Sequence, residues 1–399
     1  MEKPAQKPKK TGCLRIFALV GAGLFLVLAG ILVWIWLSNR SLPQTSRVVE
    51  KLDDASKAYL LEAEHLRRSL GESVWPGFGQ VDDIPAILYN EDYAFLTGYA
   101  DPPDGWIKVP AGQHRGGPWE PVPEDTLNGA VYYRQILPAG GVTPEAFTVL
   151  VGERWVFSLS TLEWTRIGLR NTIRDDLPEP LQPFFPYALF INNLVSGSDQ
   201  YVSLMLHEAF HAFEGMQAPE RLADAEEANA SDGLYPWEDQ DLQANWKKEV
   251  DLLAQALESD NPGGTVEIVQ AFLKTRSERR SNGGLGEKLV DYERQREWLE
   301  GLARYTELRS WQLAASAADY QPVPQMNLLA DFKDYRNYDQ RWQREIYQLR
   351  RSVNESGEGR FYYTGMAQAF LLDRLLPGWK ERALQPGVWL EDLLQEAVQ

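Results

Sequence analysis

The chain has 399 residues, of which 44% are hydrophobic and 24% charged, and its formal net charge is −17. These proportions exclude a disordered chain, a coiled-coil rod and a polytopic membrane protein, and the length suffices for one large domain or two modest ones. The acidic charge argues against nucleic acid as a partner, because phosphate binding needs a basic surface. The single cysteine, Cys13, excludes an intrachain disulfide and a cysteine-based zinc site.

The N-terminus differs from the rest of the chain. Residues 1–15 are basic, and residues 16–37 form an apolar run without a charge. At about 1.5 Å per residue, this run is long enough to cross roughly 30 Å of hydrocarbon. Because the basic flank comes first, the positive-inside rule predicts a single-pass cell-membrane protein. Its cytoplasmic tail would be 1–15, its transmembrane helix 16–37, and the remainder would be extracytoplasmic.

A cleaved signal peptide is the alternative interpretation of this run. Such a peptide has an apolar region of about 7–15 residues followed by a small-x-small cleavage site. Here the run is longer and ends in the bulky residues Trp34 and Trp36, followed by Arg40. We therefore expect an uncleaved anchor, joined by a polar linker at 38–47 to the rest of the chain.

The remaining residues, 48–399, are expected to form one α+β domain. Apolar spacing predicts an amphipathic helix over 48–70, ended by Gly71. Short β-branched and aromatic runs between turn signals then predict strands. These runs are 86–89, 93–98, 131–133, 147–151 and 155–159. From about Asp199 onward helical spacing dominates, so a small sheet precedes a mainly helical half. The stretch 218–237 is acidic and irregular, and it is expected to be a loop or lid.

The most informative motif is His207-Glu208-Ala209-Phe210-His211, within a stretch that has helical apolar spacing and no proline. Positions i and i+4 lie on one face of a helix about 5–6 Å apart. Two imidazoles there can bind one metal ion, and the intervening Glu208 can act as a base toward a water molecule. Only four histidines occur in the chain, and half of them fall in this pattern. Two hydrogen-bonded histidines on a surface helix are the alternative.

A zinc site needs a third protein ligand. A histidine six residues after His211 would indicate a metzincin, but that position is Gln217. The better candidate is Glu300, in a predicted long helix over 291–317, because a second helix could bring its carboxylate to both imidazoles. The next residue, Gly301, costs roughly 1 kcal/mol of helix stability relative to alanine. A close approach of another helix would explain this glycine.

These two motifs resemble those of the gluzincins, whose aminopeptidase branch has a second motif of the form E-G-x-A-x-Y-x-E. The matching residues are Glu300, Gly301, Ala303, Tyr305 and Glu307, together with His207, Glu208 and His211. The resemblance implies a zincin-like fold, Zn²⁺ as cofactor, and Glu300 as third zinc ligand. Glu307 would orient a ligand or pair with Arg304. The motifs lie 89 positions apart, so 218–290 is expected to be a helical insertion, and the G-x-M-E-N segment of the aminopeptidases is absent.

A hydrolase also needs a donor to the oxyanion that forms when water attacks a carbonyl. The donor in gluzincins is often a later tyrosine or histidine, and no histidine follows His211. Tyr362 and Tyr363 are the candidates, of which we select Tyr363, and packing in the core is the alternative role for both. An edge strand can pair with an extended peptide substrate, and 93–98 and 155–159 are candidates for it.

The sequence therefore predicts a membrane-anchored, extracytoplasmic zinc hydrolase, and specifically a peptidase acting on peptides or proteins. The predicted metal ligands are His207, His211 and Glu300, with Glu208 as base. A membrane-tethered binding protein with a structural zinc ion is one alternative, although such a site needs no base. A glycosidase or carbohydrate-binding protein is another, suggested by the many tryptophans and acids, but no pair of facing carboxylates is evident.

Overall fold

The computed structural model describes residues 11–110, 112–138, 143–144, 147–195 and 197–399. It is an α+β structure that divides into two compact units. Among the described residues, the first unit comprises 11–47 and 163–195, and the second comprises 48–162 and 197–399. The grouping of 163–195 with the N-terminal segment differs from the expectation of one domain over 48–399.

The first unit contains the apolar N-terminal helix. Its helices are α1 (Thr11–Arg40), α3 (Leu162–Asp176), the short 3₁₀ turn η1 (Gln182–Phe184) and α4 (Tyr187–Leu194). Within α1, the span Leu19–Arg40 is apolar and long enough to cross a membrane, and only 6% of its most apolar window is buried. An apolar, uncovered helix is compatible with a single-pass anchor and also with a signal sequence.

The second unit has a mixed β-sheet. Its described strands are β1 (Ala86–Tyr89), β2 (Tyr93–Leu96), β3 (Trp106–Lys108), β4 (His114–Arg115), β5 (Glu120–Pro121), β6 (Tyr133–Ile136), β7 (Phe147–Val151) and β8 (Arg154–Ser160). Their order is β4-β3-β7-β8-β1-β2-β6-β5, and the β1–β8 pair is parallel whereas the other pairs are antiparallel. The expected strands at 86–89, 147–151 and 155–159 are confirmed, and the one expected at 131–133 begins at Tyr133.

One expectation about the sheet is wrong. Strands β2 and β8 both lie in the interior of the sheet, since β2 pairs with β1 and β6, and β8 pairs with β7 and β1. Neither has a free edge for a peptide, because the backbone groups on both sides of an interior strand are already paired. The sequence could not reveal this, because the order of strands depends on contacts between segments distant in the chain.

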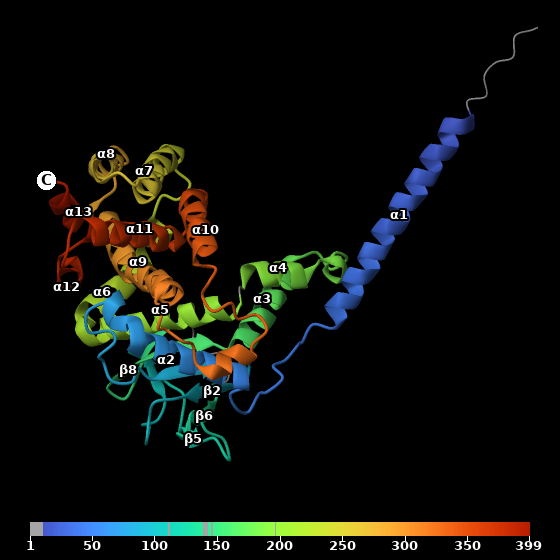
Figure 1. Cartoon of the computed structure of the whole chain (residues 1–399), viewed down its shortest axis with the longest axis horizontal. Coiled ribbons are helices and arrows are strands. Elements are labelled where there is room, and N and C mark those ends of the chain that lie inside the picture. The colour runs from blue at the N-terminus through green and yellow to red at the C-terminus, as the bar shows by residue number, and fades with distance from the viewer. Residues whose placement is uncertain (1–10, 111, 139–142, 145–146, 196) are drawn as a thin grey trace, which may run out of the picture. The chain divides into compact units, whose positions relative to one another are not determined.

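The helices of the second unit cover this sheet in successive layers. They are α2 (Asp54–Val74), α5 (Ser198–Gln217), α6 (Pro219–Ala228), α7 (Gln240–Glu258), α8 (Pro262–Asn282), α9 (Glu287–Ser316), α10 (Tyr338–Arg351), α11 (Gly359–Leu375), α12 (Trp379–Ala383) and α13 (Leu390–Ala397), with the 3₁₀ turns η2 (Asn229–Leu234), η3 (Pro324–Leu328) and η4 (Ser352–Asn354). Helix α5 packs on strands β7 and β8 of the sheet, and α2 packs on α5. Helix α9 packs on both of these helices, and α11 packs on α9 (Figure 1). Helix α5 is therefore held between the sheet and α9.

Large aromatic side chains fill the space between these layers. The fully buried tryptophans include Trp75, Trp106, Trp246, Trp298 and Trp379. The ring of Trp75 at the end of α2 lies 5.1 Å from that of Phe210 on α5 and 5.3 Å from that of Trp379 on α12. Such edge-on aromatic pairs add about 0.5–1.5 kcal/mol to the gain from burial alone. They hold α5 against the helices that follow it in the chain.

The stretch 218–237 is not the loop or lid that its composition suggests. It forms α6 and the turn η2, with Leu222 and Ala225 buried. The guanidinium of Arg221 donates to the backbone oxygens of Ala383 and Val388, both at 2.6 Å. These bonds and the buried side chains fix the segment to the C-terminal part of the chain. The expected helical character of 218–290 is confirmed by α6, α7 and α8.

Candidate metal centre

Helix α5 presents both histidines of the motif on one face. The sequence predicted a helix around the motif, and this helix is α5 (Ser198–Gln217). His207 and His211 lie one turn apart, with ring centroids separated by 4.9 Å. Both are buried, as are apolar residues on the remaining faces of the helix, among them Val202, Met205 and Phe213. A helix this well packed holds the two imidazoles in a fixed relation to each other.

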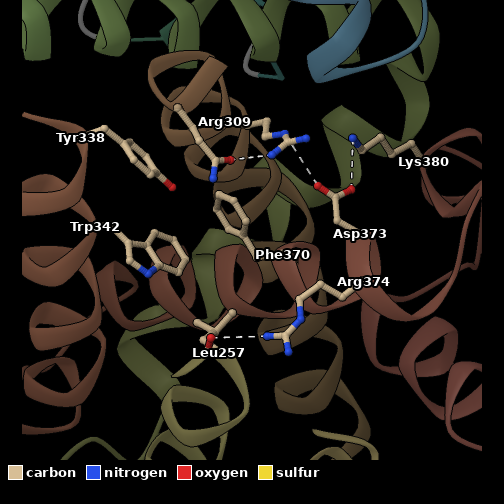
Figure 2. A pocket seen from close by; sticks show the side chains of 9 residues that line it. Leu257, Arg309, Tyr338, Trp342, Phe370, Asp373, Arg374 and Lys380 are labelled. Atoms are coloured by element: carbon tan, nitrogen blue, oxygen red, sulfur yellow. Dashed lines mark hydrogen bonds and ion pairs between the residues drawn. The ribbon is translucent and has the colours of Figure 1, made fainter. Parts of the chain in front are cut away.

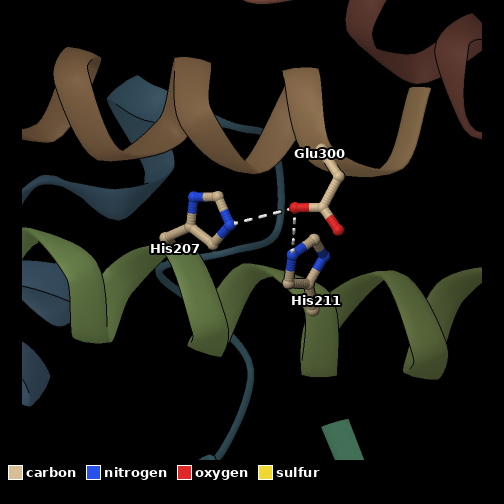
Figure 3. Close-up of side chains that lie close together, drawn as sticks. All are labelled: His207, His211 and Glu300. Carbon is tan, nitrogen blue, oxygen red and sulfur yellow. Dashed lines mark ion pairs between the residues drawn. The ribbon is translucent and has the colours of Figure 1, made fainter. Parts of the chain in front are cut away.

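Helix α9 brings the carboxylate of Glu300 to these two rings (Figure 3). The Oε2 atom of Glu300 lies 3.4 Å from Nε2 of His207 and 3.5 Å from Nε2 of His211. One ligand atom from each of the three residues lies within 4.8 Å of the other two, and all three side chains are buried. The group predicted from two motifs 89 positions apart is therefore assembled in space and could hold a metal ion.

The far nitrogen of each imidazole faces a second carboxylate. Nδ1 of His211 lies 2.9 Å from Oε2 of Glu214, and Nδ1 of His207 lies 3.7 Å from Oε2 of Glu307. A histidine that binds metal usually donates its other ring N–H to such a group, which fixes the tautomer and the ring orientation. The sequence suggested a supporting role for Glu307 but missed Glu214. Its position three residues after His211 on the same helix was the available signal.

Arginines hold these carboxylates in place. Nη2 of Arg296 lies 2.6 Å from Oε1 of Glu300, which leaves Oε2 directed to the two histidines. Glu307 is paired with Arg304 on its own helix and with Arg341 of α10, whose Nη2 lies 3.0 Å away. A buried carboxylate is costly unless it is paired and hydrogen-bonded. These ion pairs therefore allow both acids to remain charged and oriented.

The electrostatics of the group favour an added positive charge. Burial alone lowers the pKa of His211, but Glu214 and Glu300 raise it well above its usual value. Burial also lowers the pKa of His207, but Glu300 and Glu307 raise it by more, so the pKa lies above its usual value. The same carboxylates that hold protons on the rings would stabilise a divalent cation in their place. Two imidazole nitrogens and one carboxylate oxygen are also a donor set that suits Zn²⁺.

Glu208 lies within the field of this group. It is buried, with 6% of its surface exposed, and no hydrogen bond joins it to another described side chain. Burial raises its pKa, whereas His207 and His211 act to lower it. A carboxylate without a fixed partner is available to accept a proton, which a structural acid in an ion pair is not.

Of the two candidate tyrosines, Tyr362 is the nearer to the histidines. Its ring is stacked on that of His207, with centroids 5.9 Å apart and planes inclined by 11°. Burial and the charge of Glu300 raise its pKa well above the usual value. Tyr363 instead lies against Arg304, whose guanidinium carbon is 5.8 Å from the centre of the tyrosine ring. The geometry therefore favours Tyr362 over the Tyr363 that the sequence analysis selected.

The other two histidines lie outside the group. Nε2 of His65 is 2.9 Å from the backbone oxygen of Gln321, and Nε2 of His114 is 2.9 Å from that of Asp104. Each is thus engaged in local structure. Among the described residues, His207, His211 and Glu300 form the one cluster of histidine, cysteine and acidic side chains close enough to hold an ion.

A separate cavity of about 530 Å³ lies among α9, α10 and α11 (Figure 2). Its wall includes Arg309, which follows Glu300 by nine residues, about 13 Å along α9 and on its opposite face. In this wall Asp373 lies 3.1 Å from Nζ of Lys380 and 4.0 Å from Nε of Arg309. Arg374 donates to the backbone oxygens of Ala256 and Ser259. The cavity therefore does not adjoin the histidine group.

Comparisons with known protein families, with curated proteins and with solved structures find no match for this chain. Its function has to be argued from the histidine–glutamate group itself.

Proposed function

We propose that this chain is a membrane-anchored zinc hydrolase of zincin-like fold, and specifically a peptidase whose catalytic unit lies outside the cytoplasm. One observation carries the proposal. The Nε2 atoms of His207 and His211 converge on a single oxygen of Glu300, while each Nδ1 faces a further carboxylate. Convergence of the two imidazoles on one carboxylate, with a further carboxylate behind each ring, is the arrangement that metal-binding histidines use.

The donor set supports zinc but also suits one other metal. Two histidines and a carboxylate bind catalytic zinc in one class of enzymes, and they also bind Fe(II) in certain oxygenases. We favour zinc because Glu208 stands between the two histidines in sequence, where a hydrolase needs a base. When bound, the metal ion would supply a Lewis acid that polarises a carbonyl and makes water nucleophilic at neutral pH.

Glu208 would act as the general base. It would take a proton from the attacking water and pass it to the leaving amine as the peptide bond breaks. Its burial and the lack of a hydrogen bond to any described side chain support this role. The hydroxyl of Tyr362 would donate to the oxyanion, since its ring lies against that of His207.

The anchor and the order of elements support the remaining parts of the proposal. The basic residues before α1 favour a cytoplasmic N-terminus, which would leave the second unit outside. The order of a sheet, then a helix with the H-E-x-x-H motif, then a helix with the third acid agrees with the resemblance to gluzincins. The resemblance favours peptides or proteins as substrates, because its second motif is of the aminopeptidase form.

Replacement of the base tests the function. The Glu208→Gln variant of the full-length chain, purified in detergent, should bind as much zinc as the wild type. Its cleavage of a fluorescence-quenched peptide library should fall by about 10²-fold or more. Glu220→Gln, an exposed acid on α6, is the matched control and should keep full activity. Undiminished cleavage by Glu208→Gln, or cleavage by the wild type that survives chelation, would contradict the proposal. A wild type that binds zinc and cleaves nothing would favour a binding protein.

A further inference from the structure

The first unit exposes an apolar segment next to α1. We define the apolar segment as 181–194, which contains η1 and α4. Five of its large apolar side chains are between 43% and 61% exposed: Leu181, Phe184, Leu189, Phe190 and Leu194. A soluble surface rarely gathers so many large apolar groups in so short a stretch, and such patches usually mark a binding surface.

Helix α4 is apolar on two faces. Tyr187 and Ile191, one turn apart, are buried at 3% and 5% exposure. Leu189, Phe190 and Leu194 are 61%, 43% and 60% exposed, and the polar Asn192 is exposed beside them. A helix on the surface of a soluble protein buries one apolar stripe and shows water a polar face. Helix α4 instead shows water three large apolar side chains, which suit an apolar medium, and carries no charged residue.

Hydrogen bonds place this segment at the end of the membrane-crossing span. Asn39, in the last turn of α1, donates from Nδ2 to the backbone oxygens of Pro183 at 3.0 Å and Phe185 at 2.8 Å. The span in α1 ends at Arg40, and Figure 1 shows α4 next to this end of α1. Polar residues that end such a span lie among the lipid head groups. The apolar segment therefore begins at the level of the lipid–water boundary.

We propose that the apolar segment lies in the surface of the outer leaflet, as a second membrane contact beside α1. The lipid of the same membrane is the occupant that the geometry favours, because Asn39 binds the segment to the part of α1 that would stand in the head groups. Helices of this kind bury their apolar face about 5–10 Å into the boundary, and aromatic rings such as those of Phe184 and Phe190 suit that depth. The inference rests on the anchored state in the proposed function and not on the metal centre.

A fluorescent label on the segment tests this inference in the full-length chain. On a Cys13→Ser background, Leu189→Cys labelled with an environment-sensitive dye is reconstituted in phosphatidylcholine vesicles with and without spin-labelled lipid. The control is Leu328→Cys on the second unit, where the side chain is 84% exposed. We expect quenching by the lipid spin label at least threefold stronger at 189 than at 328. Equal quenching at the two positions would overturn the inference.

Two further readouts separate the possible failures. Flotation of the vesicles tests the anchor: a chain that does not float with lipid lacks the anchored state, and the inference falls with it. A label at 189 that is shielded from water but not quenched by lipid would show a protein partner instead and would also overturn it.

A charged substitution in the apolar segment is a second test. Leu189→Glu, read by a label at Leu194→Cys, should lower the quenching by spin-labelled lipid at least twofold. Leu234→Glu, at a site of similar exposure on the second unit, should not.

Discussion

Gly301 on α9 and Gly365 on α11 face each other so closely that a methyl group added to Gly301 would lie 2.4 Å from the Cα atom of Gly365. A methyl group on Gly365 would lie 2.2 Å from the backbone oxygen of Glu297. Backbone meets backbone here, so no flexible side chain can move away. This contact sets α9, which carries Glu300, against α11, which carries Tyr362, and it explains the glycine that the sequence placed beside the third ligand.

We therefore expect Gly301→Ala to destabilise the protein. Overpacking a tight contact costs about 1–3 kcal/mol, and separation of the two helices would also displace Glu300. Urea denaturation measures the free energy of unfolding, and metal titration measures the affinity. Gly168→Ala in α3 is the matched control: nothing lies within 4 Å of the added methyl group. It should stabilise its helix by up to about 1 kcal/mol. Equal stability of the two variants would contradict the contact.

Glu214→Gln should weaken metal binding without unfolding the chain. Its carboxylate accepts from Nδ1 of His211, and a neutral amide in its place would hold the ring less well and could select the wrong tautomer. Loss of such a partner typically reduces metal affinity by about 10–100-fold. Competition with a zinc-binding dye measures this. The control is Glu267→Gln, which replaces an exposed acid on α8 and should bind metal as the wild type does. An unchanged metal affinity in Glu214→Gln would show that Glu214 does not support His211 as a ligand.

Removal of one hydroxyl at a time distinguishes the two tyrosines. Tyr362→Phe keeps the ring that stacks on His207 but removes the donor, so kcat should fall by about 10²-fold while zinc content stays the same. Tyr363→Phe should change kcat little, because that ring packs on Arg304. The reverse pattern, with activity lost only in Tyr363→Phe, would restore the assignment made from the sequence.

The stability of the chain should fall in acid through Glu391. Burial raises the pKa of this carboxyl, but Arg276 and Arg280 lower it by more than burial raises it. The resulting pKa is about 2. A carboxyl whose pKa is lower in the folded state stabilises the fold above its unfolded pKa of about 4.3, and this contribution is lost as the pH falls from about 5 to 2. The shift corresponds to about 3 kcal/mol.

Urea denaturation at several pH values measures this loss. Glu391→Gln should be less stable than the wild type at pH 7, and its stability should depend less on pH between 5 and 2. Glu396→Gln is the control on the same helix, where an exposed carboxylate pairs with Arg382; its pH dependence should follow the wild type, since exposed pairs contribute little. If Glu391→Gln keeps the full pH dependence, other carboxyls carry it.

The local parts of the site could be predicted from the sequence. The spacing of His207 and His211 is a property of one helix, so the helix that carries them could be predicted. Gly301 indicated a close helix contact because glycine in a helix interior needs a reason. Helix α2 begins at Asp54 and not at 48, because the Asp53 side chain accepts from the backbone N–H of Ser56 and caps the helix there.

The non-local parts could not be predicted in this way. That β2 and β8 lie inside the sheet follows from pairings with strands far along the chain. Tyr362 and Tyr363 are adjacent in sequence, and which of them reaches His207 depends on how α11 is rotated against α9. The arginine that holds Glu300, Arg296, is one of several charged residues in a helix whose buried face only the packing reveals.

Metal analysis of the folded chain tests the central claim most directly. The full-length protein, purified in detergent and equilibrated with zinc, iron and manganese in competition, is analysed beside Glu300→Gln, with circular dichroism to confirm that both are folded. We expect one zinc ion per wild-type chain and a large loss in the variant. A folded wild type without metal, or zinc bound equally by both proteins, would contradict the three-residue site, and one iron ion in place of zinc would contradict the proposed hydrolase.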